Sequence, residues 1–246
     1  MRKTTLLITA ALALCLALPA AADTVLKMTS QTDAFQVMGQ NQPAQDAEIT
    51  YWIGEDRALR DDGETATLLK DDTLYVLNHA EKSYSVLELP VDLSSLLPDQ
   101  NREQMEQMLQ AMEMTATVEP TDEEKEINGY SARRYDVVLE NQMGMKIEST
   151  VWATEELDVD LESFHRMSKA MASLQPGGAA MAEELLRVAG VPVLMETRIQ
   201  GMGGSTEARE ELISAETKDA PPETYEVPEG YREREFNPMP QSGGGM

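Results

Sequence analysis

Cysteine and histidine, which supply much of enzyme chemistry, are scarce in this sequence of 246 residues, with one cysteine and two histidines. Cys15 lies in an N-terminal apolar run, which excludes a disulfide, a thiolate nucleophile and a cysteine metal site from the remainder of the chain. His79 falls in a predicted hairpin loop and His165 in a predicted helix, and neither accompanies a nucleophile motif. We therefore expect no catalytic residues, no metal site and no cofactor, and a protein that is not an enzyme.

Basic residues are also few, because 20 Lys and Arg stand against 44 Asp and Glu, giving a formal net charge of −24. Nucleic acids attract clustered Lys and Arg, so the composition argues against a nucleic-acid partner. Hydrophobic residues make up 41% of the chain. Because that fraction is too high for a disordered acidic chain, the sequence predicts a folded protein with a core.

The first 22 residues have the three parts of a signal peptide: Arg2 and Lys3, the apolar run Leu6–Leu18, and Ala20-Ala21-Ala22. The apolar run is shorter than the roughly 20 residues that span a membrane. We expect cleavage after residue 22 and a soluble periplasmic protein that is not integral to the membrane.

Lipidation at Cys15 is not expected, because Leu14 precedes it where a lipoprotein signal has a small residue. No linker is visible further along, so a single domain is predicted over residues 23–236. Residues 237–246 include three consecutive glycines, and we expect a disordered tail.

Most of the mature sequence alternates apolar and polar residues, which favours β-strands in an antiparallel meander. Asn128-Gly129 predicts a tight hairpin, because both residues tolerate positive φ. The turns expected at Asp61-Asp62-Gly63 and residues 78–81 separate further strands. The predicted strands cover residues 25–28, 35–38, 49–53, 65–69, 74–77, 84–89, 115–118, 130–139, 145–153, 193–201 and 206–217.

Two segments instead repeat apolar residues at helical spacing. In the first, Asp99 is a candidate cap for a helix whose apolar face is Met105, Met108, Leu109 and Met112. The second begins near Asp160, is interrupted by Pro176-Gly177-Gly178 and continues for a turn or two, with Gly190 as a C-cap. Its apolar residues are Leu161, Phe164, Met167, Met171, Leu174, Met181, Leu185 and Val188.

The chain contains 16 methionines, for which three interpretations are open. Met112-x-Met114, Met143-x-Met145 and Met105-x-x-Met108 resemble thioether spacings that bind Cu(I). Methionine also adapts to varied apolar ligands and fills irregular cores. Because several of these residues form the apolar helix faces, core packing or an adaptable lining is favoured over copper.

Several motifs occur in an order that resembles an uncharacterised family of secreted bacterial proteins with a domain of unknown function. The likeness covers residues 24–235, and its Ile-x-Gly-Tyr and Pro-x-Gly-Tyr elements indicate the fold and no reaction. The motifs are Tyr51-Trp52-Ile53 with Arg57 and Arg60-Asp61-Asp62, Lys82-Ser83-Tyr84, residues 125–137, Trp152-Ala153-Thr154, Gly190-Val191-Pro192-Val193 and Val227-Pro228-Glu229-Gly230-Tyr231.

That family is similar in fold to the lipoprotein-localisation factors, which implies an α+β fold with a curved antiparallel sheet covered by two or three helices. In such a half-barrel the sheet encloses an apolar cavity that receives acyl chains. The acidic surface departs from what a carrier between membranes requires. On the helices, the residues expected to face the concave side of the sheet and bind the ligand are Met105, Met108, Leu109, Met112, Phe164, Met167 and Met171. On the opposing wall, formed by the sheet, the expected ligand-binding residues are Tyr130, Tyr135 and Trp152, with Tyr51 and Ile53 as further candidates.

The leading hypothesis is thus a non-enzymatic periplasmic protein that binds or carries an apolar lipid or acyl ligand. An envelope interaction protein with a solid core is the alternative, and a methionine-based copper binder is a third. The sequence names neither the ligand nor a protein partner.

Overall fold

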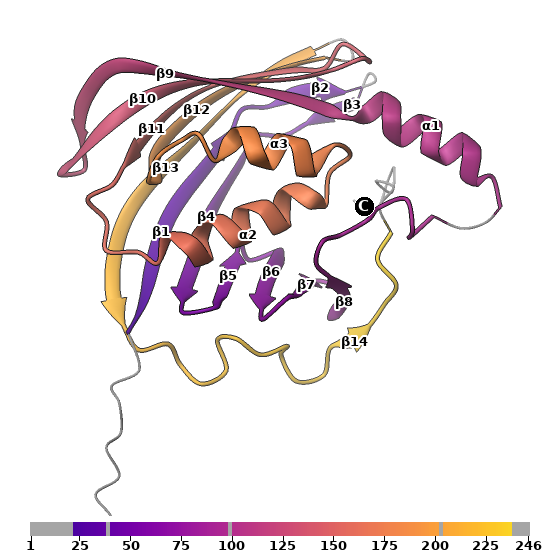
Figure 1. Ribbon diagram of the computed structural model, residues 1–246, viewed down its shortest axis with the longest axis horizontal. Coiled ribbons are helices and arrows are strands. Elements are labelled where there is room, and N and C mark those ends of the chain that lie inside the picture. The colour runs from indigo at the N-terminus through magenta and orange to yellow at the C-terminus, as the bar shows by residue number, and fades with distance from the viewer. Residues whose placement is uncertain (1–21, 38–39, 98–99, 202–203, 238–246) are drawn as a thin grey trace, which may run out of the picture.

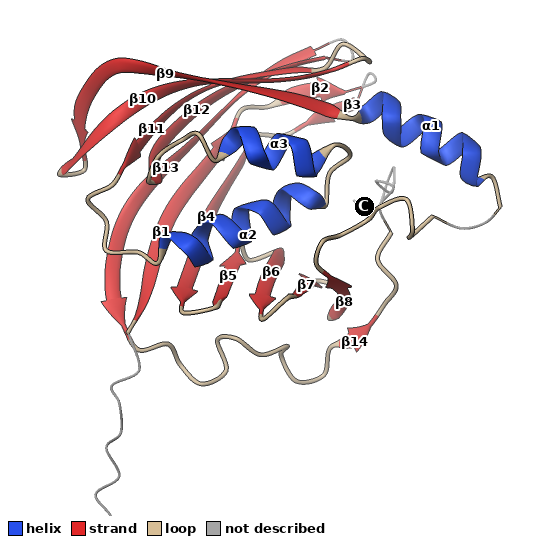
Figure 2. Ribbon diagram, viewed as in Figure 1, coloured by secondary structure: helices blue, strands red, loops and turns tan. Residues whose placement is uncertain are grey.

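The computed structural model describes residues 22–37, 40–97, 100–201 and 204–237. Residues 1–21 of the predicted signal peptide, with Cys15, lie outside this part of the chain, as do residues 238–246 of the predicted tail. Within it, twelve strands form one curved open sheet, two more form a small ribbon, and three helices complete the fold (Figures 1 and 2). The expected α+β class is confirmed, with more sheet and less helical cover than we predicted. A single domain over residues 23–236 stays a prediction.

The first half of the sheet is a meander in which the strands lie in the order β8-β7-β6-β5-β4-β1. One of its strands, β5, was not predicted, because arginines and an aspartate interrupt its apolar alternation. The ribbon of β2 and β3 lies between β1 and β4 in the chain. The bounds are β1 Asp23–Thr32, β2 Phe35–Val37, β3 Gln40–Gln42, β4 Gln45–Gly54, β5 Arg57–Asp61, β6 Thr65–Lys70, β7 Thr73–Asn78 and β8 Ser83–Glu88.

The second half is a meander in the order β13-β12-β11-β10-β9. The predicted hairpin is confirmed: Asn128 and Gly129 have φ of 51° and 86°, and Ile127 pairs with Tyr130. Strand β9, at the edge, continues through an acidic run where we expected only a short strand. The bounds are β9 Met114–Ile127, β10 Tyr130–Asn141, β11 Lys146–Thr154, β12 Val191–Gly201 and β13 Gly204–Lys218.

The pairing of β1 with β13 joins the two meanders into one sheet. It runs antiparallel from Asp23↔Lys218 to Thr32↔Ala208, with one register shift at Lys27/Met28. At the opposite edge from β9, the short strand β14 (Arg232–Glu233) pairs in parallel with β8. The sheet is therefore antiparallel everywhere except at this one edge.

Three helices accompany the sheet: α1 (Arg102–Met112), α2 (Leu161–Ser173) and α3 (Gly178–Leu185). Helices α2 and α3 lie within the curve of the sheet, and we call the face toward them the inner face (Figure 1). Helix α1 projects beyond the end of β9 (Figure 1). Two helices thus lie against the sheet, within the predicted two or three.

Local sequence explains where the helices begin and end. Asp160 caps α2, because its side chain accepts hydrogen bonds from the amides of Glu162 and Ser163 at 3.0 and 3.1 Å. Helix α1 begins after Asn101 without a side-chain cap, and the cap predicted at Asp99 lies outside the described residues. Helix α3 ends at Leu185 with Leu186 as its C-cap, so the C-cap predicted at Gly190 is wrong.

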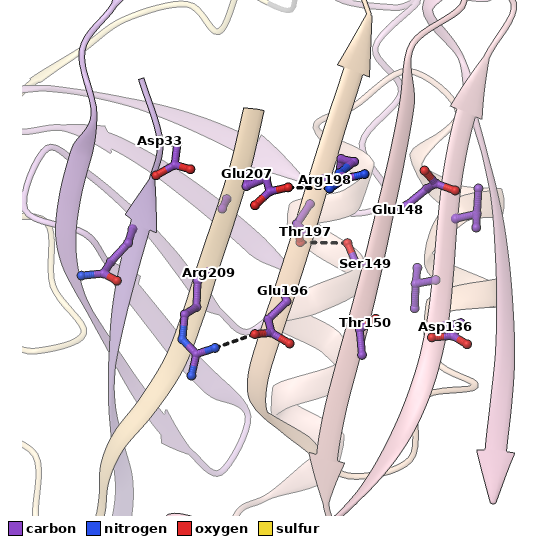
Figure 3. A pocket seen from close by; sticks show the side chains of 14 residues that line it. Asp33, Asp136, Glu148, Ser149, Thr150, Glu196, Thr197, Arg198, Glu207 and Arg209 are labelled. Atoms are coloured by element: carbon purple, nitrogen blue, oxygen red, sulfur yellow. Dashed lines mark hydrogen bonds and ion pairs between the residues drawn. The ribbon is translucent and has the colours of Figure 1, made fainter. Parts of the chain in front are cut away.

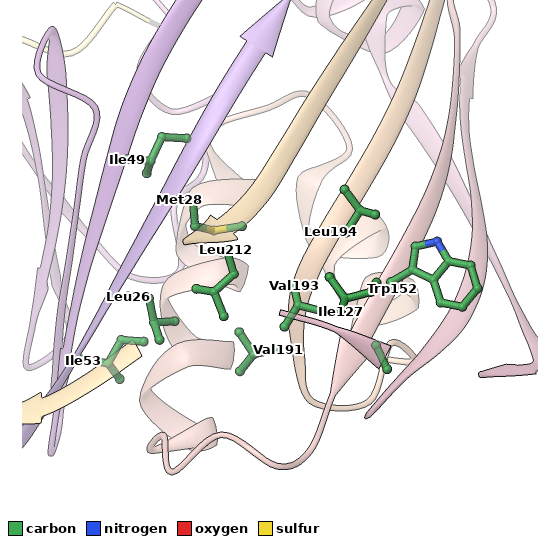
Figure 4. Close-up of a cluster of buried hydrophobic side chains, with 11 residues drawn as sticks. Leu26, Met28, Ile49, Ile53, Ile127, Trp152, Val191, Val193, Leu194 and Leu212 are labelled. Carbon is green, nitrogen blue, oxygen red and sulfur yellow. The ribbon is translucent and has the colours of Figure 1, made fainter. Parts of the chain in front are cut away.

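Both faces of the sheet bury apolar side chains. On the inner face of the first meander, Met167 of α2 is 1% exposed and packs in a cluster with Leu69, Leu74 and Leu87. On the outer face, Tyr225 of the C-terminal segment is buried with Leu68. At the junction of the meanders, Figure 4 shows a further cluster, made of Leu26, Met28, Ile49, Ile53, Ile127, Ala132, Trp152, Val191, Val193, Leu194 and Leu212.

Gly190 forms the tight entry into β12 instead of a helix cap. Its φ is +82°, and a Cβ there would lie 2.1 Å from the carbonyl oxygen of Thr154. Gly63 has a similar φ of +85°, but a Cβ there would meet nothing within 4 Å. Gly190 therefore needs both a positive φ and the absence of a side chain, whereas Gly63 needs only the positive φ.

We predict that Gly190→Ala lowers the free energy of unfolding by more than about 3 kcal/mol, because it adds a backbone clash to a positive φ. Gly63→Ala, the control, carries only the conformational cost of about 1 kcal/mol. Urea denaturation of both variants measures the difference. Equal losses would contradict the close approach at Gly190.

Candidate functional site

The outer face of the second meander carries a broad polar hollow of about 670 Å³ (Figure 3). Its two arginines are already paired across the strands: Arg198 with Glu207, and Arg209 with Glu196, each at 2.6 Å. Such exposed ion pairs are solvated and contribute little free energy. We interpret this outer hollow as an ordinary polar surface of the sheet.

A second hollow, which we call the inner cavity, lies between α2, α3 and the inner face of β10, β11 and β12. Its volume is about 260 Å³, and its lining is mostly apolar. It is lined by Val137, Leu139, Ser149, Val151, Phe164, His165, Ser168, Lys169, Ala182, Leu185, Leu186, Val188, Gly190, Pro192 and Met195.

The register of the strands turns the lining side chains of the sheet toward the helices. Tyr135, Val151, Met195 and Glu210 are successive partners across β10, β11, β12 and β13. Because side chains in one such row share a face, the whole row lies on the inner face with Val151 and Met195. Along β10, the period of two then brings Val137 and Leu139 to the same face.

Helix α2 divides its residues between core and cavity. Met167 and Ala170 are buried against the first meander, whereas Phe164, His165, Ser168 and Lys169 line the inner cavity. Residues three and four apart share a face of a helix, which explains why Phe164 and Ser168 lie together. The cap at Asp160 fixes where this arrangement begins.

The polar groups of the inner cavity come mainly from α2. The Nε2 atom of His165 is buried and has no hydrogen-bond partner among the described residues. Burial, followed by the nearby charge of Lys169, lowers the pKa of the His165 imidazole, so the neutral form is favoured. Lys169 forms an ion pair with Glu183 of α3 at 2.8 Å.

Next to the cavity, the inner face carries a polar cluster that sequence reasoning missed. Arg60 forms an ion pair with Asp62 at 2.8 Å, and its partner across the sheet is Tyr51. Burial raises the pKa of the Tyr51 hydroxyl despite the opposing charge of Arg60. Burial likewise raises the pKa of the Glu210 carboxyl, with Arg60 and Ser30 acting in the opposite direction.

The ligand-binding residues predicted on α1 do not line the inner cavity. Leu109 is buried against Leu93 and Leu97, and Met105 packs at the edge of the same cluster. Met108 is 47% exposed, so the expectation that it faces the sheet is wrong. Helical spacing located the amphipathic face, but what the face packs against is decided by the loop at residues 91–97.

Of the residues predicted on α2, Phe164 lines the inner cavity. Met167 and Met171 instead belong to the cluster packed against the first meander. They share the helix with Phe164 but lie on the side that the core occupies.

The predicted aromatic wall is divided between the two faces of the sheet. Tyr51 contacts Phe164 with ring centroids 6.4 Å apart, and Tyr135 is buried beside Val151. Ile53 lies in the cluster at the junction of the meanders, and Tyr130 packs against that cluster.

Trp152 is on the outer face, so its predicted facing is wrong. It neighbours Val151, which points inward, and a shift of one residue along a strand reverses the side chain. There the Nζ of Lys125 lies 4.0 Å from the centroid of its ring.

The comparison with known families matches residues 37–231 to DUF4412, a domain of unknown function. The chain belongs to the DUF4412 family. This confirms the resemblance to an uncharacterised family that the sequence motifs indicated. No curated protein matches this DUF4412 chain.

Three solved structures are similar to parts of this DUF4412 chain. PNGF-II has a TM-score of 0.42 and 15% identity, covering 87% of this chain, which in turn spans only 31% of that protein. An uncharacterized conserved protein from Thermus thermophilus has a TM-score of 0.40 and 6% identity, over 85% and 89% of the two chains. A putative outer membrane lipoprotein-sorting protein domain from Vibrio parahaemolyticus has 0.26 and 9%, over 82% and 88%. Similarities at this level say nothing about what the DUF4412 chain binds.

Neither a metal site nor a membrane span is found in the described segments. Within residues 22–37, 40–97, 100–201 and 204–237, no helix is long and apolar enough to cross a membrane. No group of three or more His, Cys, Asp or Glu side chains in those segments could hold a metal ion.

The division of methionines between core and surface gives a direct test. Met167→Ala should lower the free energy of unfolding by about 2–5 kcal/mol, because it leaves a cavity under α2. Met108→Ala should change it by less than about 0.5 kcal/mol, because that side chain is exposed. Chemical denaturation of both variants measures these effects. A large loss of stability in Met108→Ala would contradict the exposed position of that side chain.

The raised pKa of Glu210 predicts a pH-dependent stability. A carboxyl whose folded pKa exceeds its unfolded value destabilises the fold above that pKa, and the penalty disappears as the pH falls and both states bind the proton. Glu210→Gln should therefore raise the melting temperature at pH 7 and leave it nearly unchanged at pH 4. Thermal melting at both pH values, with the exposed Glu48→Gln as control, tests this. A gain that is larger at pH 4 would contradict it.

Proposed function

We propose that this DUF4412 protein binds a small apolar ligand, or one segment of an acyl chain, in the inner cavity. The observation that carries the proposal is the apolar lining itself, in which Val137, Leu139, Val151, Leu185 and Met195 surround about 260 Å³. An apolar cavity of about 150 Å³ in a protein stays dry and accepts benzene. The inner cavity is large enough for a ring system or a short hydrocarbon chain.

The curved sheet acts in this proposal as a half-barrel, with α2 and α3 as its cover. Both walls come from regular elements that the core holds in place, which preserves the shape of a binding site. Phe164 belongs to the cover, and Met195 contributes a flexible thioether that adapts to varied apolar shapes.

Binding without catalysis is the favoured activity. The two serines that line the inner cavity are bonded elsewhere: the hydroxyl of Ser149 to Thr197 at 2.9 Å, and that of Ser168 to the carbonyl of Phe164 at 2.9 Å. The buried Nε2 of His165 has no hydroxyl partner in the described part of the chain that it could activate as a base. We therefore propose a binder or carrier that acts in the periplasm after its signal peptide is removed.

Occlusion of the inner cavity is the experiment that tests this. The neutral fluorophore N-phenyl-1-naphthylamine should bind the wild-type protein with increased emission. Ser168→Phe should abolish the increase, because the ring fills the cavity from the side of α2. We expect at least a tenfold loss of affinity, equivalent to about 1.4 kcal/mol.

Ser173→Phe is the matched control for occlusion. Ser173 is on the same helix and half-buried, and it also bonds within that helix, to the carbonyl of Ala170 at 2.6 Å, but it does not line the inner cavity. This variant should bind the fluorophore normally. Absence of binding by the wild type, or normal binding by a folded Ser168→Phe variant, would overturn the proposed function in favour of a protein with a solid core.

A further inference from the structure

We propose that the inner cavity selects amphiphiles, namely short acyl chains that end in one anionic oxygen group, and that His165 and Lys169 hold that group. This inference rests on the proposed function and names the class of ligand. The inference starts from the lining of the inner cavity, which is apolar except for a few polar side chains that come mainly from α2.

The two side chains lie on the same stretch of α2. Residues 165 and 169 are four apart and therefore neighbours on one helix face, and both line the inner cavity. A ligand oxygen at this face can meet both nitrogen groups at once, while its chain extends toward Val137, Leu139 and Val151.

His165 has an unused hydrogen-bonding atom. Its Nε2 is buried without a partner among the described residues, and leaving a buried polar atom unpaired is unfavourable. A ligand oxygen that accepts a hydrogen bond from Nε2–H removes this cost. A hydrocarbon without such an oxygen leaves it in place.

Lys169 determines the sign of the ligand's charge. It is the one cation among the described residues of the lining, and no carboxylate belongs to that lining. Glu183 on α3 pairs with it at 2.8 Å, but 71% of that carboxylate side chain is exposed. An anionic ligand therefore gains an attractive charge at Lys169, and the water around the exposed Glu183 carboxylate weakens the repulsion from it.

A carboxylate and a phosphate monoester share this chemistry, and both sources are covered by the test. Octanoate, octyl phosphate and octanol have the same chain and differ only in the end group. Isothermal titration should show both anions binding about tenfold more tightly than octanol, since a hydrogen bond to a charged group is stronger than one to a neutral group. The anion should also draw a proton onto His165 near pH 6, visible as a dependence of the heat on buffer ionisation.

His165→Gln should abolish the proton uptake, and Lys169→Met should remove most of the preference for anions while octanol still binds. The control is Lys27→Met: Lys27 is 46% exposed and pairs with Glu48, much as Lys169 at 45% pairs with Glu183. It does not line the inner cavity and should leave the preference intact.

The outcomes separate this inference from the proposed function. If octanol binds as tightly as octanoate, and Lys169→Met changes neither, the cavity binds apolar ligands but the anionic class is wrong. If none of the three ligands binds the wild type, the proposed function itself fails. Loss of preference in Lys27→Met to the same extent as in Lys169→Met would show that only overall charge matters.

Discussion

The packing of α2 between the two halves of the sheet is the contact on which the other features depend. Its Met167 side fills the concave face of the first meander, and its Phe164 side faces the second. One helix with two different faces thus spans the inner side of both meanders, which the pairing of β1 with β13 joins into one sheet. Helix α2 packs tightly against the first meander only, and α3 covers the space beside β10, β11 and β12. The short side chain of Ala182 on α3 leaves room there for the inner cavity.

Much of the architecture could be predicted from periodicity, because each strand buries one face and each helix one stripe. The hairpin at Asn128-Gly129, both helices after Asp160 and most strands follow from this. Strand β5 could not be recognised, since Arg57 and Arg60 carry charges whose partners, Asp23 and Asp62, are found only in the folded chain. The acidic part of β9 was missed for a related reason: an edge strand tolerates charge that a central strand excludes.

The candidate site was harder to predict than the fold. Methionines at helical spacing indicated amphipathic faces, but spacing does not say whether a face meets a core, a cavity or solvent, and Met167 and Met108 show two of these outcomes. Trp152 was misplaced because the facing of a strand changes with a single residue. Val137, Leu139 and Val151 could have been found from the alternation of β10 and β11. The role of His165 depends on the absence of a partner, which no sequence pattern reveals.

The position of β1 at the centre of the sheet has a consequence for the order of folding. The first strand of the domain pairs on one side with β4, which follows it closely, and on the other with β13, which is synthesised last among the long strands. Contacts so distant in sequence slow folding, because a long loop must close before they form. The first meander can assemble from the N-terminal third of the chain alone, leaving one side of β1 unpaired until β13 arrives. Throughout that interval the partly folded chain exposes a hydrogen-bonding edge that chaperones or neighbouring chains can capture.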